Sequence, residues 1–90
     1  MSKSPPITIT SDELRADVED RLDRWIPDAV WSRAEPYARH KLDLYRERWP
    51  DVDHYGNEYL VALTTDTVHE IELSSATLAA CEAIMAIAAS

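Results

Sequence analysis

Apolar residues recur at helical spacing near the start of the chain. The positions that share this face are Leu14, Val18, Leu22 and Trp25. Thr10 comes just before this stretch and is followed three residues later by Glu13, the pattern of a capping box that opens a helix. Pro27 cannot continue a helix because it lacks an amide hydrogen. The sequence therefore predicts a first helix that begins after Thr10 and ends near Ile26.

A second helical pattern covers residues 28–49 and contains a proline. The apolar positions of its stripe are Ala38, Leu42, Tyr45 and Trp49. Pro36 disfavours helical geometry at Glu35 and removes a hydrogen-bond donor. We therefore expect a short helix over residues 28–34 and a longer one that opens at Pro36 and ends before Pro50.

Residues 59–73 alternate between apolar and polar side chains, which favours strands. A three-residue turn over 65–67 would form a β-hairpin and put five apolar residues on one face: Tyr59, Val61, Leu63, Ile71 and Leu73. Glu70 and Glu72 would then lie together on the other face. The turn contains no glycine, so a helix over residues 58–63 remains an open alternative.

The remaining segments complete an α+β prediction. Residues 7–10 alternate β-branched side chains and would add a third strand to the hairpin. A last helix, apolar nearly all round, begins at Ser74 or Ser75 and covers 76–89. We expect a flexible tail over residues 1–6 and a single small α+β domain over 7–90, with three or four helices, a small antiparallel hairpin and an apolar C-terminal helix packed on the sheet or on a partner.

Charge is divided unevenly along the chain. The net charge is −8, and all nine Lys and Arg residues lie in the first 48 positions. Residues 49–90 carry only acids, and six of these form the predicted partner-binding set: Asp51, Asp53, Glu58, Asp66, Glu70 and Glu72. A localised field of one sign indicates a partner of the opposite sign, although acids also serve solubility alone.

Residues 33–48 hold five cations among aromatic residues, but acids interleave with them. A direct nucleic-acid interface normally shows a basic footprint, and this acidic chain as a whole repels phosphate. We interpret the segment as a solvated helix face with ion pairs, and we expect no direct binding of nucleic acid.

No catalytic set is present in the sequence. Cys81 lies in the apolar C-terminal stretch without a neighbouring cation, as a buried and inert thiol does. The loop 51–58 resembles the opening of a calcium-binding loop, but Tyr55 and Ala62 stand where ligands are required. In that loop we expect Gly56 to supply a positive φ. The histidines have no metal-ligand spacing. We predict a protein that is not an enzyme and that holds no cofactor and no metal.

The function predicted from these observations is that of a small acidic protein-binding domain. It would inhibit a nucleic-acid-handling assembly by covering its basic surface, as a nucleic-acid mimic of the phage anti-defence type does; this is an analogy from size and charge. The alternative is an oligomerisation or accessory-subunit module that uses the apolar C-terminal helix, as in a homodimer. We expect no membrane contact, because residues 76–89 are too few to span a bilayer and contain Glu82. A single cysteine and the absence of a signal-like N-terminus favour the cytoplasm.

Overall fold

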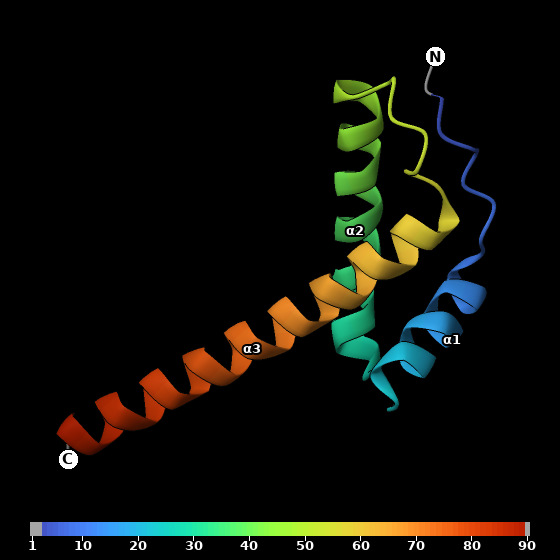
Figure 1. Cartoon of the computed structure of the whole chain (residues 1–90). Coiled ribbons are helices and arrows are strands. Elements are labelled where there is room, and N and C mark those ends of the chain that lie inside the picture. Colours follow the sequence, from blue (N-terminus) through green and yellow to red (C-terminus); the bar gives the residue numbers. More distant parts are fainter. Residues whose placement is uncertain (1–2, 90) are drawn as a thin grey trace.

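The computed structural model describes the backbone of residues 3–89 and the side chains of residues 3–74. Its elements, in chain order, are helix α1 (Ser11–Leu22), helix α2 (Asp28–Arg48) and helix α3 (Asn57–Ala89). Helix α3 packs on both other helices and runs past them at its C-terminal end (Figure 1). The longest dimension of the molecule is 58 Å. Over the described backbone the fold contains no strand, so the predicted α+β class is wrong and the domain is helical.

The predicted hairpin over residues 59–73 is instead the first half of α3. The buried side chains of this stretch repeat at helical spacing: Leu60, Val61, Thr64, Thr67 and Val68. Each buried threonine satisfies its hydroxyl within the helix, since Thr64 donates to the carbonyl of Leu60 (2.6 Å) and Thr67 to that of Leu63 (2.7 Å). β-branched residues thus fit the helix without burying unpaired hydroxyls, and the helical alternative for residues 58–63 is the observed one. Ser74 lies inside α3 and caps no helix.

Helix α1 begins as predicted and ends earlier than predicted. The side chain of Thr10 accepts from the amide of Glu13 while the Glu13 carboxylate accepts from the amide of Thr10, so the capping box is confirmed. Asp23 adopts a left-handed conformation (φ 53°) and ends the helix at Leu22. The chain then turns Ile26 into the core, whereas Trp25, predicted as a core residue, is 66% exposed.

Helix α2 is one continuous helix with Pro36 in its interior, so the predicted break is wrong. Pro36 removes one helical hydrogen bond. The residues around it compensate by packing, because Trp31, Ala34 and Ala38 are all buried in the core. Trp49, predicted as the last member of the apolar stripe, is 45% exposed at the C-terminal cap.

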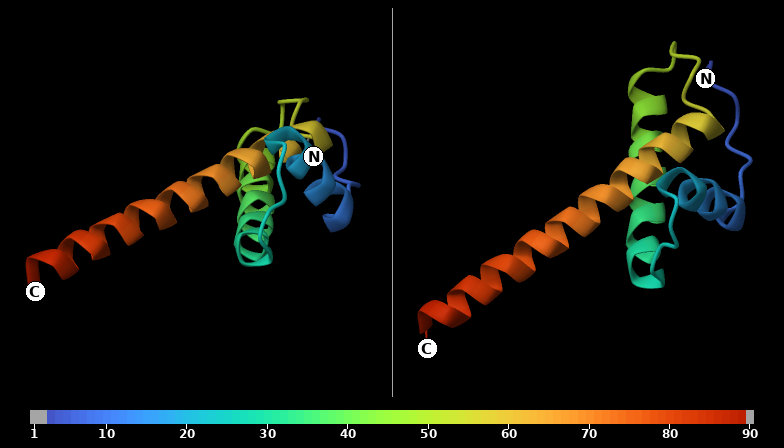
Figure 2. Two further views of the ribbon diagram at one scale, coloured as in Figure 1. Left: turned by 90° about the horizontal axis from the view of Figure 1, so that it is seen from below. Right: turned by 60° about the horizontal axis from the view of Figure 1, so that its bottom comes forward.

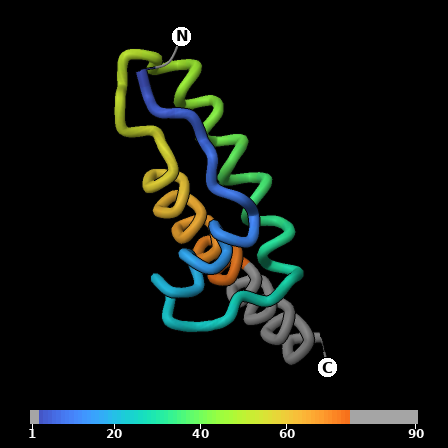
Figure 3. Tube along the Cα trace, turned by 90° about the vertical axis from the view of Figure 1, so that its right-hand side faces the viewer, coloured from blue at the N-terminus to red at the C-terminus, as the bar shows by residue number. Residues whose placement is uncertain are grey.

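Residues 3–10 form an extended segment, here called the N-terminal strap, which lies along α2 and the start of α3 (Figures 2 and 3). The guanidinium of Arg46 holds one end of the strap. It donates to the carbonyls of Pro5 (2.7 Å) and Ser4 (3.4 Å) and also to the carbonyl of Tyr55 (2.7 Å). The strap is therefore fixed by side chains, and residues 7–10 do not form the predicted third strand.

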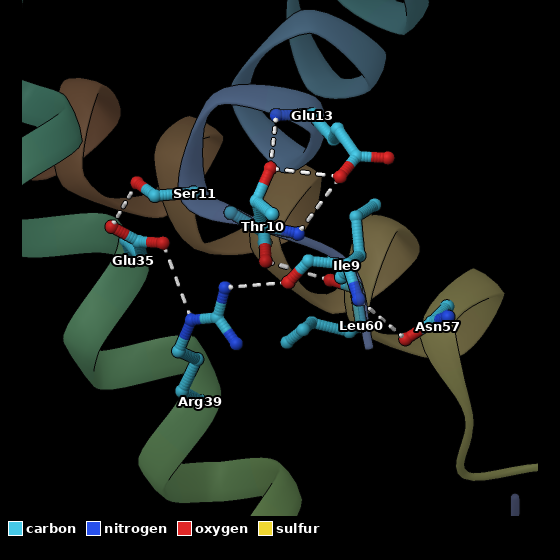
Figure 4. Close-up of polar contacts among 9 residues, drawn as sticks. Ile9, Thr10, Ser11, Glu13, Glu35, Arg39, Asn57 and Leu60 are labelled. Carbon is cyan, nitrogen blue, oxygen red and sulfur yellow. Dashed lines mark hydrogen bonds and ion pairs between the residues drawn. The ribbon is translucent and has the colours of Figure 1, made fainter. Parts of the chain in front are cut away.

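The other end of the strap is held from α2 and α3 together (Figure 4). The side-chain oxygen of Asn57 accepts from the amides of Thr8 (3.0 Å) and Ile9 (3.3 Å). Arg39 donates to the carbonyl of Ile9 (3.3 Å). These bonds satisfy backbone groups that a neighbouring strand would otherwise have to pair.

Position 56 requires glycine because there is no room for a side chain, and not because of its φ angle. Its φ is not positive, so the prediction of a positive-φ turn is wrong. A Cβ atom at Gly56 would lie 2.7 Å from Cγ of Pro5. The strap therefore approaches the backbone of the α2–α3 connection too closely for any side chain there.

Candidate functional site

The six acids predicted to bind a partner fall into three groups. Asp51, Asp53 and Glu58 lie in or just after the α2–α3 connection, and all three are exposed. Asp51 approaches Lys3 of the strap at 3.9 Å, with its own side chain 92% exposed, so this pair is solvated and weak. Asp53 and Glu58 have no ion-pair partner among the side chains that the structure describes.

Asp66 and Glu70 form the second group, one turn apart on α3. Both are exposed, and within residues 3–74 neither meets a cation. They lie on the side of α3 opposite to the buried Leu60, Thr64 and Val68, as the helical period requires. Their carboxylates therefore point away from the domain.

Glu72 stands apart from Glu70, although the predicted strand would have placed them side by side. Two positions on a helix differ by about 200°, which puts them on opposite sides. Glu72 accordingly turns toward the loop after α1 and pairs with Arg24 at 2.5 Å, with 30% of its side chain exposed. Its other oxygen, Oε1, is buried and makes no hydrogen bond within the described part of the chain. The Glu72 carboxylate is thus paired within the domain.

An aromatic cluster separates the acidic loop from α2. Tyr55 contacts Tyr59 and Tyr45 with ring centroids 4.8 and 5.9 Å apart, and His54 packs edge-on against Tyr55 at 4.8 Å. Burial raises the pKa of Tyr59, and the neighbouring Tyr55, Tyr45 and Asp66 raise it further. The cluster fixes the α2–α3 connection against α2, and Asp51 and Asp53 of this connection remain exposed.

The outward face of α2 carries cations and aromatic rings that were not predicted as a site from the sequence. Lys41 lies over the ring of Tyr37 at 4.6 Å, and Arg48 lies over the ring of Trp49 at 5.3 Å. Of the five cations in residues 33–48, only Arg39 forms an ion pair within the described part of the chain. The signal that could have revealed this face is the spacing of residues 33, 37, 41, 44 and 48, which places them on one side of a helix.

No three or more His, Cys, Asp or Glu side chains in the part of the chain that the structure describes come together as metal ligands would. Over the same residues, none of the helices has both the length and the apolarity to cross a bilayer. In comparisons with known proteins, the chain matches no family model, no curated protein and no solved structure.

Proposed function

We propose that this chain is a small acidic binding domain that covers a basic surface on a nucleic-acid-handling protein. The observation that carries the proposal is the exposed pair Asp66 and Glu70, which point outward from α3 and have no cation partner among the described side chains. Glu58, Asp53 and Asp51 extend the same charge toward the α2–α3 connection. The proposal includes action in the cytoplasm and no enzymatic step.

The spacing of these carboxylates suits a row of Lys and Arg side chains. Glu58 and Asp66 are separated by eight helical residues, or about 12 Å, and Asp66 and Glu70 by about 6 Å. Carboxylates at such intervals can occupy cationic sites that otherwise bind phosphates, and long-range attraction speeds the encounter. A partner covered in this way could not bind its nucleic acid.

The test is affinity capture from the native host with three forms of the protein. Asp66→Lys/Glu70→Lys reverses the proposed contact, whereas Asp43→Lys/Glu47→Lys makes the same charge change at the same spacing on α2. We expect the wild type and the α2 control to retain basic proteins at low salt, and the α3 variant to lose them at least tenfold. Capture by the α3 variant at wild-type strength, and insensitive to salt, would contradict the proposal.

A second candidate function is an oligomerisation or accessory-subunit module built on the C-terminal part of α3. It is favoured by the length of this helix, because 33 residues span about 50 Å while the 21 residues of α2 span about 32 Å. Figure 1 shows α3 continuing past both other helices. Replacing Ile84 or Ile87 with Asp should give a folded monomer if this part is an interface, as measured by light scattering and circular dichroism.

A further inference from the structure

The outward face of α2 is both cationic and apolar. Its cations are Arg33, Lys41 and Arg48, and its exposed apolar side chains are Tyr37 (53%) and Leu44 (49%). Near the C-terminal end of α2 this surface is concave, with Leu44, Arg48 and the adjacent Trp49 among the lining residues. Large, partly exposed aromatic and Arg side chains around a depression are the composition of interface hot spots.

The three cations of this face are not used to hold the fold together. Within residues 3–74, none of them pairs with a carboxylate, and Lys41 and Arg48 rest on aromatic rings instead. By contrast, Arg15 pairs with Asp28 at 2.7 Å. Glu47 is the acid that shares the outward face, so three cations and one acid leave a formal charge of +2 there.

The same chain carries a surface complementary to this face. Arg33 and Lys41 are eight residues apart on α2, and Glu58 and Asp66 are eight residues apart on α3, a separation of about 12 Å in both cases. Arg33, Glu58 and Asp66 are exposed, and Lys41 is part-buried. Asp66 lies opposite the buried side of α3, whereas the α2 face flanks the buried side of its helix, about 100° around the helix from it.

We infer that the α2 face binds the acidic face of α3, formed by Glu58, Asp66 and Glu70, from a second copy of this chain. Because the two faces are different surfaces, the α2 face of one copy meets the α3 face of another, and each copy offers both faces. The net charge of −8 opposes association at long range, so the contact depends on local complementarity. This inference does not rest on the proposed function, since it involves the chain alone.

The test compares three charge variants by sedimentation equilibrium. Arg33→Glu/Lys41→Glu/Arg48→Glu reverses the α2 face, and Asp66→Lys/Glu70→Lys reverses the α3 face. Asp43→Lys/Glu47→Lys is the control, because it changes the net charge as much as the α3 variant does. Circular dichroism checks that each variant folds.

At about 0.3 mM protein we expect the average mass of the wild type to exceed the monomer mass of 10.2 kDa by about 1.5-fold or more, and to fall on dilution. Each face variant alone should be a monomer, while an equimolar mixture of the two should associate again, because each reversed face then meets an opposite charge. The control should associate at least as strongly as the wild type, since its new cations lie on α2.

Three results would overturn the inference. The first is a wild type that stays monomeric at 0.3 mM. This includes the case in which the α2 face binds an added single-stranded oligonucleotide instead of a second copy of the chain. The second is association that survives reversal of the α2 face, which would place the contact elsewhere, as on the C-terminal part of α3. The third is a mixture of two folded face variants that remains monomeric.

Discussion

Cations and acids are used differently in the two halves of this molecule. Of the cations in the first half, Arg46 binds three backbone carbonyls, Arg15 binds Asp28, and Arg24 reaches across to Glu72. Of the acids in α3, Asp66 and Glu70 bind nothing within the described residues. Four of the nine cations, counting Arg39 with Glu35, therefore hold the fold, whereas the exposed acids of α3 within residues 57–74 are available to a partner. The cations of the outward α2 face, like Arg21 on α1, pair with no carboxylate among the described side chains.

The largest expected effect comes from removing a structural cation. Arg46→Met should lower the free energy of unfolding by about 2 kcal/mol, because it leaves the carbonyls of Ser4, Pro5 and Tyr55 without their charged donor. Arg48→Met is the matched control and should change it by less than about 0.5 kcal/mol, since Arg48 is exposed and rests only on Trp49. Urea unfolding measures both. Equal effects would remove the distinction between the two kinds of cation.

A smaller effect is expected for the acids, and it should separate two glutamates that are neighbours in sequence. Glu72→Gln should lower the free energy of unfolding by about 0.5–1 kcal/mol, because the pair with Arg24 is part-exposed and solvent screens it. Glu70→Gln should leave stability within about 0.5 kcal/mol of the wild type. Thermal unfolding of the two variants at equal ionic strength checks this difference, and a larger loss for Glu70→Gln would refute it.

The smallest effect is confined to alkaline pH. The pKa of Tyr59 is raised in the folded protein, so above the ordinary tyrosine pKa of about 10 the unfolded chain loses this proton first. Stability from this group is full below that pH and is lost as pH rises through the folded pKa. Tyr59→Phe should therefore flatten the fall in stability above about pH 10, measured by urea unfolding at several pH values. An unchanged slope would show that Tyr59 does not contribute.

Local signals in the sequence predicted α1 well and α3 poorly. The capping box of Thr10 and Glu13 lies within four residues, so it could be recognised without the rest of the fold. In residues 59–73 the apolar positions fit both a strand and a helix. The choice depends on which face is buried and on threonine hydroxyls that bond within the helix, and neither is visible in the sequence.

The candidate site was predictable in composition but not in arrangement. The sequence identified the six acids, and the helix then separated Glu72 from Glu70. The partner of Glu72, Arg24, lies 48 positions away in the chain, so no local pattern could have shown that this carboxylate is occupied. The ion pairs predicted along residues 33–48 are fewer than expected for a related reason. Acids interleave with the cations in sequence, but in the described structure only Arg39 pairs with one of them.

The N-terminal strap has a consequence for the kinetics of folding. The hydrogen bonds that tie it to α2, α3 and their connection join residues 30 to 51 positions apart, whereas α1 and α2 form from local contacts. Closing so long a loop is favoured only after the helices that hold Arg46 and Asn57 are in place. We expect the strap to dock after the rate-limiting step, so Arg46→Met should speed unfolding and leave the refolding rate nearly unchanged in stopped-flow experiments. The strap then sets the lifetime of the folded state and not the speed of its formation.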